Sequence, residues 1–178
     1  MNGLTKMFIE KNIEQIENNE FTAVYKNASG DHVDIQDLTN TLYEADIDPL
    51  EHMTEIPKKF FYRSAKSIDG FKIPNNIQTI RDHAFYQTDI MEINIPEGVT
   101  SIESKSFGMC PNLLFVSIPH SMEFIDRAVF LGSNALAEVR YNGTLEEWDA
   151  IDKYDKWISL SRGIRVHLIC RDGDRWVN

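Results

Sequence analysis

The middle of the chain repeats one pattern three times: IPNNIQTIRDHAFYQT (73–88), IPEGVTSIESKSFGMC (95–110) and IPHSMEFIDRAVFLGS (118–133). The prolines of these units are spaced by 22 and 23 residues, and the second isoleucine and the phenylalanine keep the same steps. These columns are Pro74, Pro96 and Pro119, then Ile80, Ile102 and Ile125, then Phe85, Phe107 and Phe130. A period of this length with several apolar positions in each unit predicts a solenoid with one coil per repeat.

Stacking buries the apolar face that each coil cannot hide alone. Alternation at Ile93–Ile95 and at Val116–Ile118 predicts short strands whose apolar side chains point inward, and the proline that follows ends each strand. Ile56 and Phe61 extend the isoleucine and phenylalanine columns upstream. We therefore expect stacked short parallel strands in about four coils over residues 53–144.

A resemblance follows from the repeat itself. LLFVSIPHSMEFIDRAVF (113–130) resembles the L-x-x-I-x-I-P-x-x-V-x-x-I-x-x-x-A-F pattern of the BspA-type leucine-rich repeat, with Val129 at a position that is usually small. YNGTLEEWDAI from Tyr141 resembles the last strand and terminal helix of that family, and IRVHLICRDG from Ile164 resembles its closing strand. The resemblance covers roughly residues 53–173. It implies protein–protein recognition without catalytic residues, in a family most often found on secreted or cell-surface proteins.

Both ends of the solenoid need a cap, and the sequence predicts one at each end. Residues 1–52 have helical periodicity at Phe8, Ile9, Ile13 and Ile16 and again at Phe21, Val24 and Tyr25, and a second helix is expected over 34–45. In residues 145–178, the spacing of Trp148, Ile151 and Trp157 predicts a helix, and Ile164, Val166 and Leu168 alternate as a final strand. The expected fold class is thus α+β: a short leucine-rich-repeat solenoid with a helical N-terminal cap and a helix/strand C-terminal cap.

The charge is unevenly distributed. The formal net charge is −10, and residues 31–51 hold seven acidic side chains and no lysine or arginine. This excess disfavours direct binding to nucleic acid and to anionic membranes. No signal peptide or transmembrane segment is evident, so we expect a cytoplasmic protein. Segment 31–51 either only covers the first coil or also presents a docking surface to a basic partner.

No residue pattern predicts catalysis, a metal or a cofactor. Cys110 aligns with Thr88 and Ser133, so it is expected to fill a small buried position rather than to act as a nucleophile. Cys170 follows His167 by three residues on a strand, which places the two on opposite faces. The five histidines lack metal-ligand spacing.

The outward positions of the strands are the candidate binding surface. One outward ladder reads Lys72, Asn94, Ser117 and Arg140. Two other columns are small or polar except in one coil, where they carry Phe115 and Phe124. Exposed rings on a rigid scaffold are typical of binding hot spots. The alternative is that these two rings pack on each other or under a terminal helix.

These observations favour a non-enzymatic adaptor or inhibitor that binds an unidentified protein partner through its exposed strand face. Two alternatives remain open at this point: a structural or assembly component of a larger particle, and an acidic decoy for a nucleic-acid-binding protein. The sequence leaves the oligomeric state undecided.

Overall fold

Short strands dominate the part of the chain that the computed structural model describes, which is residues 25–26, 32–33, 50, 53–64, 68 and 70–177. The chain divides into two units, Met1–Pro49 and Leu50–Asn178. In the first unit, β1 (Tyr25–Lys26) pairs antiparallel with β2 (His32–Val33). The helical prediction is wrong at Tyr25–Lys26, where an aromatic residue with high β-propensity begins a strand, and β2 lies between the two predicted helices. The other parts of this prediction lie outside the described residues.

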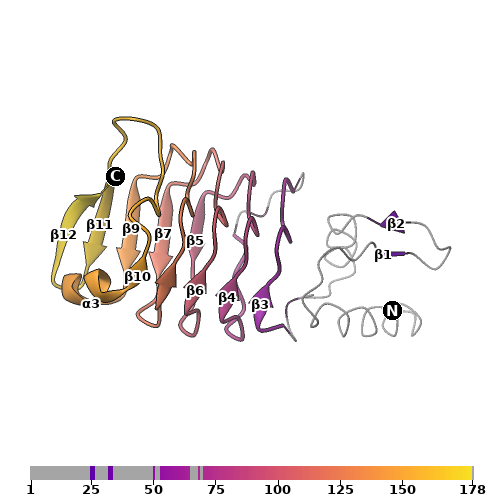
Figure 1. Ribbon diagram of the computed structural model, residues 1–178, viewed down its shortest axis with the longest axis horizontal. Coiled ribbons are helices and arrows are strands. Elements are labelled where there is room, and N and C mark those ends of the chain that lie inside the picture. The colour runs from indigo at the N-terminus through magenta and orange to yellow at the C-terminus, as the bar shows by residue number, and fades with distance from the viewer. Residues whose placement is uncertain are drawn as a thin grey trace. The chain divides into compact units, whose positions relative to one another are not determined.

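The second unit winds through two five-stranded sheets (Figure 1). Sheet 1 contains β3 (Glu55–Ile56), β4 (Thr79–Ile80), β6 (Ser101–Ile102), β8 (Phe124–Ile125) and β10 (Asp152–Lys153). Sheet 2 contains β5 (Glu92–Asn94), β7 (Phe115–Ile118), β9 (Glu138–Tyr141), β11 (Val166–Cys170) and β12 (Gly173–Val177). All neighbours are parallel except β11 and β12. The predicted solenoid of about four turns is confirmed.

Two columns of aliphatic side chains face each other inside the coils. In sheet 1, Ile56, Ile80, Ile102 and Ile125 are in register on consecutive strands, and all four are fully buried. In sheet 2, the matching column is Ile93, Val116, Val139 and Leu168. The stack of equivalent isoleucines that the repeat predicts is therefore confirmed.

A column of phenylalanine rings fills the third side of the coil. Phe61, Phe85, Phe107 and Phe130 stack with ring centroids 4.9, 5.0 and 5.7 Å apart and interplanar angles of 19°, 8° and 15°. Trp157 ends the column, because its ring meets Phe130 edge-on at 5.9 Å. The rings thus bury their faces against one another from the first coil to the C-terminal cap.

The turns on the phenylalanine side use left-handed backbone, and all but one of these positions are residues other than glycine. Two positions of each coil have positive φ: Lys59 and Arg63, His83 and Gln87, Lys105 and Met109, Ala128 and Gly132. Left-handed backbone costs an L-residue about 1–2 kcal/mol. This left-handed backbone lets the turns form hydrogen bonds to the next coil. For example, the N–H of Lys59 donates to the carbonyl of Asp82 at 3.1 Å, and the N–H of Gln87 donates to the carbonyl of Gly108 at 2.9 Å.

The C-terminal cap combines a short helix with an added strand. Helix α3 (Leu145–Ala150) begins with a capping box between Thr144 and Glu147 and buries Trp148. It ends before Ile151 because the chain enters β10, so the predicted helix reaching Trp157 is wrong. Strand β12 pairs with β11, which was expected to be last. Helix α3 is the only helix among the described residues, so the solenoid has little helix. No helix in the described part of the chain is long and apolar enough to cross a bilayer.

We predict that Phe107→Ala lowers the free energy of unfolding by about 3–5 kcal/mol, because its neighbours Phe85 and Phe130 are held by their own coils and cannot fill the cavity. The measurement is urea denaturation followed by circular dichroism. Asn94→Ala, at an exposed position, is the control and should change stability by less than about 0.5 kcal/mol. Equal effects of the two substitutions would contradict the stacked core.

A second prediction concerns the capping box. The N–H of Thr144 donates to the Glu147 carboxylate at 2.8 Å, and with His120 at 3.2 Å it lowers the pKa of Glu147 from 4.5 to about 2. Because the pKa of Glu147 is lower in the folded protein than in the unfolded chain, its ionised carboxylate stabilises the folded state fully at pH values above the unfolded pKa. This stabilisation is lost as the pH falls towards about 2. The melting temperatures of wild type and Glu147→Gln should therefore differ near neutral pH and converge in acid. Glu146→Gln controls for the loss of a charge in the same helical turn.

Candidate functional site

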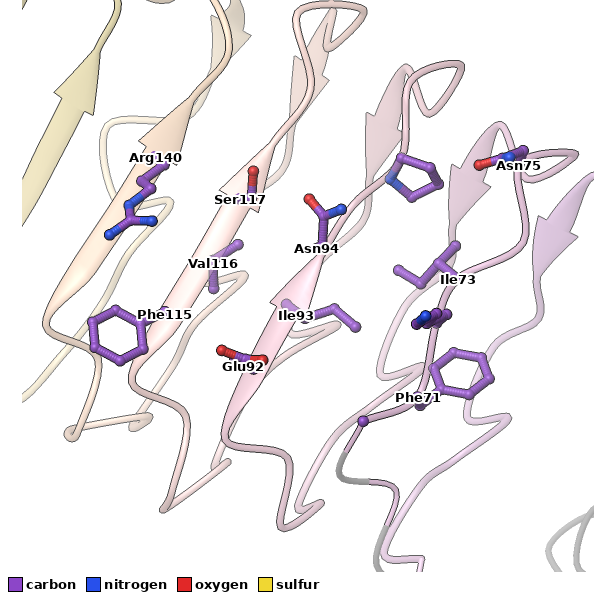
Figure 2. Close-up of a pocket in the computed structure, with 13 residues that line it drawn as sticks. Phe71, Ile73, Asn75, Glu92, Ile93, Asn94, Phe115, Val116, Ser117 and Arg140 are labelled. Carbon is purple, nitrogen blue, oxygen red and sulfur yellow. The ribbon is translucent and has the colours of Figure 1, made fainter.

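The outer face of sheet 2 carries two neighbouring rows of side chains. Asn94, Ser117 and Arg140 are in register on β5, β7 and β9 and form the first row. Glu92, Phe115 and Glu138 form the second. Figure 2 shows the Arg140–Ser117–Asn94 row beside Phe115 and Glu92. The repeat predicts the row of Asn94, Ser117 and Arg140 and the column of Phe115, and the structure brings these four residues together on one face.

A surface groove of about 650 Å³ lies over this face. Residues of β5, β7 and β9 line it together with the segment 70–75 of the preceding coil. The lining includes Phe71, Lys72, Glu92, Asn94, Phe115 and Arg140 (Figure 2). Lys72, the first member of the predicted ladder, thus reaches the same groove from outside the strands.

Phe115 is the exposed aromatic residue of the groove. Its side chain is 42% exposed, whereas Ile73, Ile93 and Val116 beneath the groove are buried. The flanking positions in the same row are Glu92 and Glu138. Because the coil interior is already filled by other residues, packing does not require a ring at position 115. The ring offers apolar surface that a partner can bury.

The groove follows a break in the strand ladder. Sheet 1 extends to β3 in the first coil, but sheet 2 ends at β5, and no strand forms over residues 70–73. Within the described part of the chain, no backbone hydrogen bond joins 70–73 to β5. Nothing lies within 4 Å of the position that a Cβ at Gly70 would take. The groove is therefore open beside Glu92.

The charges around Phe115 are only partly compensated. Arg140 forms an ion pair with Glu138 two residues earlier on the same strand. Lys72 and Glu92 are both exposed. Neither side chain has a hydrogen bond or an ion pair to any described residue. The groove thus presents one uncompensated cation and one uncompensated carboxylate beside an exposed ring.

Phe124 does not belong to this groove. It lies in sheet 1, in register with Ser101, where its half-buried ring meets Tyr154 edge-on at 6.4 Å. The two candidate phenylalanines therefore occupy different sheets and do not pack on each other. Only Phe115 joins the polar ladder.

Sequence analysis missed one exposed aromatic residue on the same sheet. Trp176 on β12 is 55% exposed and continues the row of Phe115 through Glu138 and His167. Its indole stacks on His167 at 4.8 Å, and the guanidinium of Arg165 lies 5.8 Å from the ring centroid. No repeat column reaches Trp176, because β12 is not part of a coil. The alternation of Asp174 and Trp176 was the available signal.

The cysteines serve packing. Cys110 is fully buried, its thiol donates to the carbonyl of Phe85 at 3.1 Å, and its N–H donates to the hydroxyl of Ser133 at 2.9 Å. Burial raises the pKa of the Cys110 thiol. Cys170 and His167 lie on opposite faces of β11, as predicted. No cluster of His, Cys, Asp or Glu in the described ranges could hold a metal ion.

Comparison with known proteins identifies the repeat. A family model described as a BspA type leucine rich repeat region matches residues 54–151 in six copies. No curated protein and no solved structure matches the chain. The matched residues include β3 to β9 and α3, and thus the strands that form the groove.

We predict that Cys110 does not react with a thiol reagent in the native protein, because the reactive thiolate is both buried and disfavoured by the raised pKa. The measurement uses the Cys170→Ser variant with an aromatic disulfide reagent at mildly alkaline pH. No thiol should react before guanidinium is added, and one should react afterwards. Rapid reaction in native buffer would contradict this packing.

Proposed function

Because the chain belongs to the BspA-type leucine-rich-repeat family, whose repeat domains generally bind proteins, we propose that it is a non-catalytic adaptor or inhibitor that binds one protein partner through the outer face of sheet 2. The groove around Phe115 is the centre of this surface. Asn94, Ser117 and Arg140 form its polar side, and Lys72 lies at its far edge.

The exposure of Phe115 carries this proposal. Aromatic anchors at the centre of an interface contribute much of its binding energy, and polar groups around them contribute mainly specificity. Phe115 lies on a strand that is bonded to β5 on one side and to β9 on the other, so its backbone is held before a partner arrives. A preorganised side chain loses little conformational freedom on binding, which favours affinity.

The surface is also large enough. A stable protein–protein interface needs about 800 Å² on each partner. Sheet 2 offers five strands spaced by about 4.8 Å, and the exposed side chains extend from Lys72 to Trp176. Cys110 and Cys170 are both buried and do not contribute to this face.

We predict that Phe115→Ala weakens partner binding at least tenfold, because the anchor ring is lost, and lowers the free energy of unfolding by about 1 kcal/mol or less. The experiment is affinity capture from the native source with the full chain, followed by titration calorimetry with the purified partner. Phe124→Ala is the matched control, since it removes the same side chain from sheet 1.

Capture that survives Phe115→Ala would contradict the proposed site. Loss of capture with both variants would also contradict it, because sheet 1 would then take part in the interface. Analytical ultracentrifugation separates the assembly alternative: self-association that depends on protein concentration would favour a structural component over an adaptor.

A further inference from the structure

We propose that the groove recognises an extended partner segment in which a lysine or arginine accompanies an apolar side chain, with the cation on Glu92 and the apolar group on Phe115. This inference rests on the proposed function and adds the chemistry of the partner to it. It depends on the adjacency of Glu92 and Phe115, which are in register on neighbouring strands.

Glu92 is the acidic group of this face that needs a partner. Its counterpart Glu138 is neutralised by Arg140, which lies two residues later on the same strand. Glu92 is exposed and has no hydrogen bond or ion pair within the described ranges, although Lys72 lines the same groove. A carboxylate beside an apolar ring gains most from a cation that the partner brings, because the ring reduces the local access of water.

The shape of the groove admits a long basic side chain at this point. Glu92 lies on the edge strand of sheet 2, and the neighbouring coil contributes Gly70, which has no side chain and whose Cβ position has no described residue other than its chain neighbours within 4 Å. On the other side of Glu92, β7 presents the Phe115 ring. A lysine or arginine stem can lie along the apolar surface while its charged end meets the carboxylate.

The overall charge favours the same partner. The unit that carries the groove, Leu50–Asn178, has 18 acidic and 15 basic side chains, and this excess of three negative charges favours the approach of basic segments over acidic ones. This steering acts on the rate of encounter, whereas Glu92 acts on the bound complex. The two effects can be separated by changing Glu92 without changing the groove.

The test uses a phage-displayed library of random dodecapeptides with the full chain as bait. We expect the wild type to enrich peptides in which Lys or Arg neighbours an aliphatic or aromatic residue. Binding of one such peptide, measured by fluorescence anisotropy, should weaken at least about fivefold for Glu92→Lys, because attraction is replaced by repulsion. Replacing the basic residue of the peptide by Glu should restore binding to Glu92→Lys but not to the wild type. Glu123→Lys, at an exposed position next to β8, makes the same charge change outside the groove.

The possible outcomes distinguish failure of this inference from failure of the proposed function. Enriched peptides that bind through Phe115 but lack a basic residue would overturn this inference and leave the proposed function intact. Peptides whose binding is unaffected by Phe115→Ala, or no enrichment at all, would overturn both. Equal losses for Glu92→Lys and Glu123→Lys would assign the effect to net charge alone. Dimerisation of the wild type that Phe115→Ala abolishes would assign the groove to a second copy of the chain.

Discussion

In-register stacking of equivalent side chains is the constraint on which this structure depends. A single coil has apolar groups on both of its open faces, and another coil or a cap must cover them. Ile80 over Ile102 over Ile125, and Phe85 over Phe107 over Phe130, are the visible result. The strands of both sheets follow from this stacking, because short segments of two to five residues would not form independent sheets.

The proposed binding face is a consequence of the same constraint. Once the inward positions are fixed by the repeat, the outward positions are free to differ between coils. Phe115 occupies a position that Glu92 and Glu138 occupy in the neighbouring coils, so the core does not require a ring there. The ion pair of Arg140 with Glu138 then leaves Glu92 as the uncompensated carboxylate beside the ring.

The features that recur in every coil could be predicted from the sequence. The columns of Ile102 and Phe107, the ladder of Asn94, Ser117 and Arg140, and the burial of Cys110 all follow from a common period, so alignment of the coils with one another was enough to place them. The parts that occur once were predicted less well. Strand β12 and Trp176 have no counterpart in the coils, the end of α3 depends on the pairing of β10 with β8, and the separation of Phe115 from Phe124 depends on which of two sheets each strand joins.

The first coil is bonded to the second less completely than the later coils are bonded to one another, and this affects where local unfolding begins. Coils further along are bonded to their neighbours through both sheets and through the left-handed turns, whereas residues 70–73 show no backbone bond to β5 in the described structure. Local unfolding begins where such bonds are fewest. Of the two walls of the groove, residues 70–73 are held by side-chain packing such as that of Phe71 on Phe61 and Phe85, whereas β7 is also bonded to a strand on each side, so the wall formed by 70–73 opens at the lower free-energy cost. Part of any ligand's intrinsic affinity is spent on immobilising that wall, and amide exchange over 70–73 would slow in the complex.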